Sequence, residues 1–81
     1  MYYVYVLKSQ TRLYVGRSIN LKKRIKEHLQ GKNWTTRRLK NLELIFYEAF
    51  KSKKDSIRRE KYFKSSKGKS SLKQIIRESV K

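Results

Sequence analysis

The sequence predicts an α+β fold, a small three-stranded β-sheet flanked by helices in the order β-β-α-β-α-α. Three segments rich in aromatic and branched residues have the composition of strands, two near the N-terminus and one in the middle of the chain. The segments between and after them carry apolar residues three or four positions apart, which is typical of helices with one buried side. Because three strands cannot bury both faces of a sheet by themselves, the helices are expected to cover them.

Residues 2–8 and 13–15 are expected to form a hairpin. The first segment alternates aromatic and branched side chains, and the polar residues 9–12 between the two segments form the turn. Gly16 ends the hairpin. A residue without a side chain lets the backbone turn sharply there, or lets a ligand approach closely.

A helix is predicted between Asn20, a good N-cap, and Gly31, a C-terminal stop. Three apolar residues recur in it at four-residue intervals and are expected to face the core: Leu21, Ile25 and Leu29. Residues 32–41 are polar and basic, and they are expected to form a loop with one helical turn. This loop contains the only tryptophan, Trp34.

Residues 42–50 are predicted to form the third strand, with apolar side chains on both faces. One face carries Leu42, Leu44, Phe46 and Phe50, and the other carries Ile45, Tyr47 and Ala49. Apolar residues on both faces favour burial on both sides of this strand.

Two helices are expected to complete the single domain of residues 1–81. The first begins at Ser52 or Asp55 and ends near Ser65, with four residues on one side: Ile57, Glu60, Phe63 and Lys64. A loop containing Gly68 is predicted over residues 65–71. The last helix, capped by Ser70 or Ser71, carries an amphipathic stripe formed by Leu72, Ile75, Ile76 and Val80.

The net charge of +17 predicts a polyanionic partner, because 23 Lys and Arg residues face only six Asp and Glu residues. Nucleic acid is the leading candidate, and the alternative is that this small protein is simply basic. A membrane partner is not expected, since no apolar run is long enough to cross a bilayer and no helical pattern has a Trp or Phe belt. The absence of cysteine excludes disulfides and thiolate zinc sites, and it fits a cytoplasmic protein.

Five sequence features supply what phosphodiester hydrolysis needs. Phenols that handle a water come from Tyr3-Val4-Tyr5 and Tyr14-Val15-Gly16, a fixed cation from Arg24, a proton carrier from His28 and a metal-binding carboxylate from Glu60. The order and spacing of these residues resemble the GIY-YIG nuclease family, and in particular its short stand-alone bacterial members. The two tripeptides stand where the family has Gly-Ile-Tyr and Tyr-Ile-Gly, and the resemblance covers nearly the whole chain. It implies the small three-stranded sheet flanked by helices that the pattern also predicts.

The resemblance implies that Tyr5 orients or deprotonates the attacking water, with Tyr14 as its partner. A phenol is a poor base unless nearby cations lower its pKa, and Arg17 is close to Tyr14 in sequence. Arg24 then corresponds to the family's catalytic arginine, which steadies the scissile phosphate. The alternatives are that both tyrosines only pack a core and that Arg24 is one more solvated cation.

His28 stands four residues after Arg24, so both side chains lie on the same side of the helix. It either assists the tyrosine or contacts the phosphate, or it is a helix-end histidine stabilised by the helix dipole. Glu60 is expected to bind Mg²⁺ (or Mn²⁺), as the resemblance implies, and a salt bridge with Arg24 or a lysine is the alternative. Glu48 is the second candidate ligand.

Five residues are expected to contact nucleic acid: Gly16, Arg17, Arg37, Arg38 and Lys64. Trp34 stacks a base beside Arg37 and Arg38, or it packs on the edge of the core. The family's larger nucleases carry an asparagine near the end of the domain, and this chain has none after Asn41. Either Gln74 or a lysine takes its place, or the site is weaker.

Three functions are open at this point. The first is a Mg²⁺-dependent endonuclease acting on DNA, including structured or damaged DNA. The second is a GIY-YIG-fold module that binds DNA or RNA and cuts weakly or not at all. The third is a basic structural protein associated with the ribosome or nucleoid. They differ in whether Tyr5, Arg24 and Glu60 converge on one point, and the sequence leaves the oligomeric state open.

Overall fold

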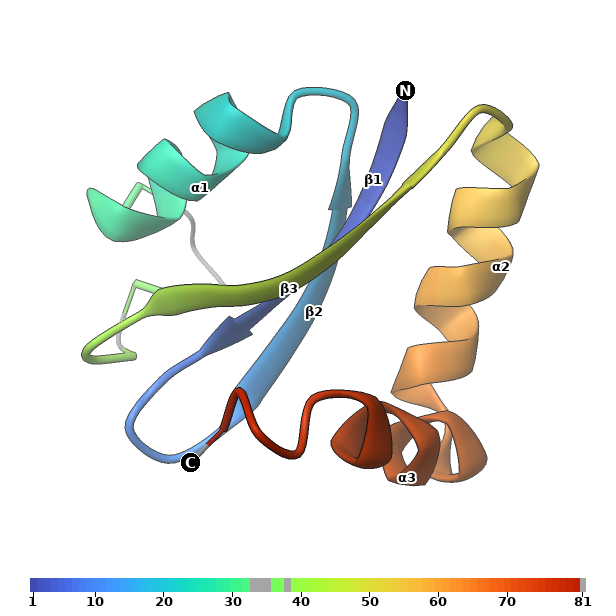
Figure 1. The fold of residues 1–81 in the computed structure, drawn as a ribbon. Coiled ribbons are helices and arrows are strands. Elements are labelled where there is room, and N and C mark those ends of the chain that lie inside the picture. The colour runs from blue at the N-terminus through green and yellow to red at the C-terminus, as the bar shows by residue number, and fades with distance from the viewer. Residues whose placement is uncertain (33–35, 38, 81) are drawn as a thin grey trace.

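The computed structural model of the chain describes residues 1–32, 36–37 and 39–80. Its elements, in chain order, are β1 (Tyr2–Lys8), β2 (Leu13–Ser18), α1 (Leu21–Leu29), β3 (Glu43–Phe50), α2 (Lys53–Lys64) and α3 (Ser66–Ile75). The strands form an antiparallel sheet in the order β2-β1-β3. Figure 1 shows α1 on one face of this sheet and α2 with α3 on the other. The predicted α+β fold and the order of its elements are confirmed.

β1 lies in the middle of the sheet and is its most buried strand. Residues 4–7 of β1 are each at most 1% exposed, because the neighbouring strands cover its edges and the helices cover its faces. β3 lies at an edge of the sheet, and none of its eight residues is fully buried. The predicted burial of both faces is therefore wrong: Phe46 and Phe50 are only half-buried on the core side, and Tyr47 on the opposite face is 53% exposed.

A β-bulge divides β3 into two halves. Val6 of β1 pairs with Phe46. The next residue, Leu7, pairs with Leu44, so Ile45 is an extra residue in β3. Phe46 and Ile45 pack against the core, whereas Leu44 lines a groove beside α1. The prediction that Leu44 and Phe46 share a face is wrong, because one inserted residue reverses the alternation of the strand.

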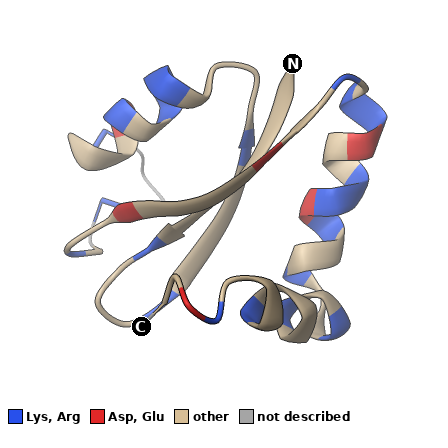
Figure 2. Ribbon diagram, viewed as in Figure 1, with Lys and Arg blue, Asp and Glu red and all other residues tan. Residues whose placement is uncertain are grey.

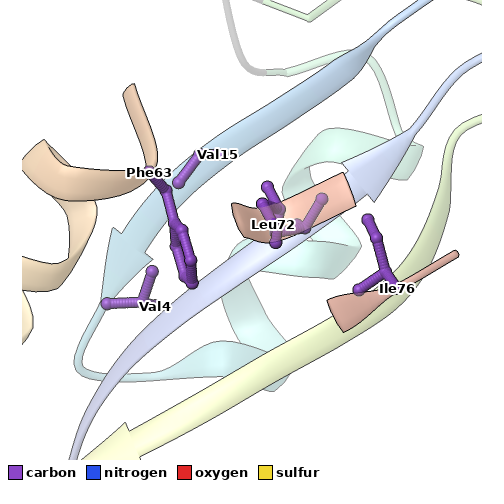
Figure 3. Packing of buried hydrophobic residues seen from close by; sticks show 6 residues of the cluster. Val4, Val15, Phe63, Leu72 and Ile76 are labelled. Carbon is purple, nitrogen blue, oxygen red and sulfur yellow. The ribbon is translucent and has the colours of Figure 1, made fainter. Parts of the chain in front are cut away.

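The hydrophobic core lies between the sheet and the α2–α3 pair. Its buried side chains are Val4, Val6, Val15, Phe63, Leu72 and Ile76, and Figure 3 shows them gathered between the strands and the two helices. Phe63 is fully buried, and its ring packs edge-on against Phe46 with the centroids 6.3 Å apart. Burial of an aromatic side chain stabilises the folded state by on the order of 3 kcal/mol, so the Phe63 ring contributes most of the packing energy between α2 and the sheet.

α2 and α3 meet at a sharp corner at Ser65. Its hydroxyl oxygen accepts a hydrogen bond of 3.1 Å from the N–H of Gly68, so Ser65 is the N-cap of α3. Gly68 lies against the backbone carbonyl of Tyr62, where a Cβ atom would collide. The predicted loop over residues 65–71 is therefore wrong. A glycine there allows two helices to approach closely, and the local sequence does not distinguish this from a loop.

α1 begins as predicted, at the cap Asn20, whose side-chain oxygen accepts a hydrogen bond of 3.1 Å from the Lys23 N–H. Leu21 and Ile25 are half-buried and line a groove against the sheet. Leu29, the third residue of the predicted stripe, is 58% exposed. Its expected core contact is wrong, since the preceding residue of α1 takes the inward position.

In α3, too, the last residue of the helix was predicted to be buried and is exposed. Ile75 is 47% exposed, whereas Leu72 and Ile76 are buried and Val80 packs against the core. Ile75 therefore does not belong to the buried stripe predicted for this helix. The buried side is narrower than predicted: Leu72 and Ile76, four positions apart, face the core, and Ile75 lies beside them toward solvent.

Positive charge is spread over all three helices (Figure 2). The longest of them, α2, has 12 residues. In the part of the chain that the structure describes, no helix has the length and apolar character needed to span a bilayer.

Candidate functional site

Tyr5 and Gly16 face each other across the paired strands β1 and β2. A Cβ atom at position 16 would collide with the hydroxyl group and the ring of Tyr5. The phenol of Tyr5 therefore lies over the backbone of β2, in the space that the missing side chain leaves. The expectation that Gly16 ends the hairpin is wrong, because β2 continues to Ser18, and the group that approaches this glycine closely is the Tyr5 side chain.

Tyr5, Tyr14 and His28 form a compact group that we call the ring cluster. The Tyr5 hydroxyl lies 2.8 Å from Nε2 of His28. The His28 ring centroid lies 5.7 Å from that of Tyr5 and 5.3 Å from that of Tyr14. Tyr5 and His28 are buried, whereas Tyr14 is partly exposed, so the cluster meets solvent at Tyr14. The structure thus brings together three of the predicted site residues from β1, β2 and α1.

Thr36 extends the ring cluster on its inner side. Its hydroxyl oxygen lies 2.5 Å from Nδ1 of His28, and the residue is fully buried. Nothing in the sequence marks this threonine, because it stands in a polar, basic segment where surface exposure is the rule. Tyr5, His28 and Thr36 form a continuous hydrogen-bonded line, and only the fold reveals it.

Burial keeps both Tyr5 and His28 neutral at neutral pH. Burial, followed by the nearby Tyr14, raises the pKa of Tyr5 far above its usual value near 10, although Arg24 acts in the opposite direction. Burial, followed by the charge of Arg24, lowers the pKa of His28 below its usual value near 6.5. At Tyr5, the loss of solvation therefore outweighs the effect of the nearby cation Arg24.

Arg24 stands one helical turn before His28 on α1. Its guanidinium lies 3.8 Å from Glu27, and its side chain is 41% exposed. Its charge acts on both Tyr5 and His28, so it lies within electrostatic range of the ring cluster. A guanidinium in this position has N–H groups available to a phosphate at the mouth of the cluster.

Glu60 lies between α2 and the edge of the sheet. One of its carboxylate oxygens is 3.5 Å from Nε of Arg17, and the other is 3.1 Å from Nζ of Lys64. Its side chain is only 22% exposed, in keeping with the inward position expected from its helical spacing. After burial and Tyr14, the charge of Glu60 also raises the pKa of Tyr5, so this carboxylate lies within electrostatic range of the ring cluster.

Glu48, the second candidate metal ligand, belongs to a structural ion pair. Arg59 donates hydrogen bonds of 2.8 and 3.2 Å to its two carboxylate oxygens. These bonds raise the pKa of Arg59, whose guanidinium also lies 4.3 Å from the ring centroid of Phe63. The carboxylate of Glu48 therefore holds α2 against β3.

For the divalent metal that the resemblance implies, this site offers one carboxylate ligand, Glu60. Among the described residues, no group of three or more His, Asp or Glu side chains is arranged to hold a metal ion. Mg²⁺ keeps several of its waters and binds through one or two carboxylates together with substrate phosphates, and the half-buried Glu60 suits this mode. Arg17 and Lys64 oppose a cation at Glu60, so a metal would fit this donor set only together with a phosphate that offsets their charge.

A groove of about 520 Å³, which we call the basic groove, runs between β2 and the α2–α3 corner. Among the described residues, its lining contains four cations, Arg12, Lys64, Lys69 and Lys73, and no acidic residue. Tyr14 also lines the groove, and Lys64 connects it to Glu60. The basic groove therefore opens beside the ring cluster, in a position suited to an anionic polymer.

The other residues expected to bind nucleic acid lie in different surroundings. Nε of Arg17 is buried and makes no hydrogen bond to the described residues, although Glu60 lies within ion-pair distance. Arg37 is exposed, next to the buried Thr36. Arg38 and Trp34 lie outside the described residues.

Comparison with known proteins gives matches that extend over most of the chain. A family model described as the GIY-YIG catalytic domain matches residues 1–74. The chain is similar to a UPF0213 protein of Clostridium perfringens, with 37% identity over 100% of this chain and 89% of that protein. It is also similar to a UPF0213 protein of Pediococcus acidilactici, with 34% identity over 91% of this chain and 80% of that protein. No solved structure matches significantly.

Proposed function

The chain belongs to the GIY-YIG family, within its short stand-alone bacterial UPF0213 group, and on this premise we propose that it is a Mg²⁺-dependent endonuclease that cuts DNA in preference to RNA. The family implies a nuclease-type activity and a nucleic acid substrate. The observation that carries the proposal is the buried hydrogen bond between Tyr5 and His28, with Arg24 and Glu60 within electrostatic range. Residues 1–81 act as one domain.

Tyr5 and His28 activate the attacking water as a pair. The phenol oxygen accepts a proton from the water while the phenol's own proton passes to Nε2 of His28, 2.8 Å away. The oxygen of the water then bonds to phosphorus, and the bond to the leaving oxygen breaks. Because burial raises the pKa of Tyr5, a free tyrosinate is costly, and simultaneous transfer to His28 avoids it.

Arg24 binds the scissile phosphate at the mouth of the ring cluster. A guanidinium stays charged at any working pH and donates to two phosphate oxygens at once. Its present partner, Glu27, lies 3.8 Å away, and both side chains are partly exposed, so a phosphate displaces this contact at little cost. Arg24 thereby holds the phosphorus near Tyr5 and stabilises the charge that develops on the phosphate oxygens.

Glu60 is the residue that would hold Mg²⁺ or Mn²⁺. A bound divalent ion supplies charge neutralisation for the phosphate and for the leaving oxygen. Arg17 and Lys64, now paired with the Glu60 carboxylate, provide positive charge for phosphates on either side of the cut. The half-buried position of Glu60 orients its carboxylate toward the sheet edge rather than into bulk water.

Nucleic acid lies in the basic groove and passes the ring cluster at Tyr14. Phosphates pair with the cations of the groove, which position the strand without reading its sequence. The net charge of +17 makes this binding strongly dependent on salt. The chain has no cysteine, which suits the reducing cytoplasm where we place this activity.

Nicking of supercoiled plasmid DNA in the presence of Mg²⁺ tests the proposal. The parent protein is expected to nick, and EDTA, Arg24→Ala and Glu60→Gln are each expected to abolish nicking while DNA retardation persists. Lys54→Ala serves as the charge-matched control for Arg24→Ala, because Lys54 is an exposed cation at the start of α2. Nicking that survives both Arg24→Ala and Glu60→Gln would refute the assigned site.

One observation favours a second function, a module that binds DNA or RNA without cutting it. Both carboxylate oxygens of Glu60 are paired with cations, an arrangement that holds α2 to the sheet without any metal. In that case the parent protein and the variants retard DNA or RNA alike, and Mg²⁺ changes neither the affinity nor the integrity of the nucleic acid.

A further inference from the structure

We propose that Thr36 is a positioning residue for His28, in that its hydroxyl oxygen accepts the Nδ1 proton and thereby leaves Nε2 unprotonated toward Tyr5. The catalytic consequence of this arrangement rests on the function proposed above, whereas the tautomer of His28 does not. Thr36 itself touches neither substrate nor reacting atoms. It acts by fixing which of the two histidine nitrogens carries the proton.

The direction of the hydrogen bond between Tyr5 and His28 follows from burial. Tyr5 is 1% exposed, and its hydroxyl lies 2.8 Å from Nε2. A neutral phenol has one proton to donate, and leaving a buried donor without an acceptor costs about 1–3 kcal/mol. Within the described residues, Nε2 is the acceptor placed at hydrogen-bond distance. The phenol therefore donates, and Nε2 accepts.

The position of the His28 ring proton follows from the direction of the Tyr5 hydrogen bond. A neutral imidazole carries one N–H, so an accepting Nε2 leaves the proton on Nδ1. His28 is 1% exposed, and Nδ1 lies 2.5 Å from Oγ1 of Thr36. A hydroxyl oxygen has lone pairs that accept this proton. Thr36 is fully buried, so water does not compete for the contact.

The opposite tautomer would block the proton transfer. With the proton on Nε2, His28 would donate to the Tyr5 oxygen, and the phenol could not pass its proton inward. The charged and titratable groups around His28 are Tyr5 from β1, Tyr14 from β2, and Arg24 and Glu27 from its own helix. Within the part of the chain that the structure describes, Nδ1 has its hydrogen bond with Thr36 and not with any of these groups. Among the described residues, Thr36 is the group that selects the tautomer.

A hydroxyl orients a histidine without the charge of the carboxylate that often does so. A carboxylate at Nδ1 would raise the pKa of the ring and so increase the fraction that is already protonated before it can accept the proton of Tyr5. Thr36 orients the ring without adding charge. Burial, followed by the charge of Arg24, lowers the pKa of His28, so the resting site holds a neutral imidazole with Nε2 unprotonated.

Nitrogen-15 NMR of the histidine ring tests the proposal directly, because His28 is the only histidine of the chain. Long-range proton–nitrogen spectra at about pH 7.5, above the usual pKa of histidine, report which ring nitrogen carries the proton. The parent protein and Thr36→Ser are expected to show the proton on Nδ1. Thr36→Val keeps the shape without the hydroxyl and is expected to shift the population toward the proton on Nε2. A parent protein with the proton on Nε2 would overturn the proposal.

Nicking rates form the second arm of the test. Thr36→Val is expected to lower kcat about 10²-fold or more, the usual range for loss of general acid–base function, with KM nearly unchanged, and Thr36→Ser is expected to restore most of it. A Thr36→Val protein that folds and keeps both the tautomer and the rate of the parent overturns the proposal. If Thr36→Val does not fold, the spectra of the parent and of Thr36→Ser decide. A parent that cuts nothing but carries its proton on Nδ1 refutes the nuclease and supports the assignment of Thr36.

Discussion

Nε of Arg17 lies 3.5 Å from a carboxylate oxygen of Glu60, and this ion pair joins β2 to α2 beside the ring cluster. Arg17 directly follows Gly16, whose missing side chain leaves the space for the Tyr5 phenol. The same contact therefore connects the packing of α2 with the position of the acid that the proposed site requires. Lys64 completes the arrangement from the last turn of α2.

The pair between Arg17 and Glu60 is expected to stabilise the fold. A double-mutant cycle with Arg17→Met and Glu60→Gln should give a coupling energy of about 0.5–1 kcal/mol, the upper part of the range for partly exposed pairs. Urea unfolding of the parent, both single variants and the double variant measures it. The more exposed pair of Arg58 and Asp55 on α2 is the control, and an equal coupling there would contradict the expectation.

Substitution Gly16→Ala is expected to displace the Tyr5 phenol. The added Cβ would collide with the hydroxyl group, so either the ring moves away from His28 or the strands separate. We expect a stability loss of about 1–3 kcal/mol, which is typical of overpacking, together with the loss of nicking. Thermal unfolding and the plasmid assay measure the two effects. Gly31→Ala is the control for nicking: no atom lies within 4 Å of a Cβ at that position, and its positive φ of 72° limits the expected cost to backbone strain.

Stability is expected to fall as the pH is lowered from about 7 to about 5, because the pKa of folded His28 lies below its usual value near 6.5. In this window the unfolded chain binds a proton at the histidine more fully than the folded chain does, so protonation favours unfolding. One such group contributes a slope of at most about 1.4 kcal/mol per pH unit. Denaturant titrations across the window measure the slope. His28→Gln is the control, and a slope as steep in that variant would assign the effect to other groups.

Phe63 is expected to dominate the stability of the core. Phe63→Ala removes the fully buried ring between α2 and the sheet, and it should cost about 3–5 kcal/mol, a large part of the stability of a domain of this size. Tyr47→Ala is the control, because Tyr47 is 53% exposed and its loss should cost far less. Circular dichroism during urea unfolding distinguishes the two. Comparable losses for both variants would contradict this account of the core.

The sequence by itself determined the features that depend on short-range order. Alternation in residues 2–8 predicted the central strand, Asn20 predicted the start of α1, and the two tyrosine motifs with Arg24 pointed to the family. Each of these signals is local, because alternation, helical spacing and caps involve residues a few positions apart. Local signals failed at the bulge of β3 and at the corner near Ser65, where contacts between elements decide the backbone path.

The tertiary structure alone decided the contacts of the site. Tyr5 and His28 are 23 residues apart in the chain, and the packing of α1 on the sheet brings the phenol to Nε2. Thr36 reaches Nδ1 in the same way, from a segment whose composition predicts only a basic loop. Glu60 forms an ion pair with Arg17 because α2 packs along β2. Contacts of this kind depend on how distant segments pack in three dimensions, and the spacing of residues along the chain does not predict that packing.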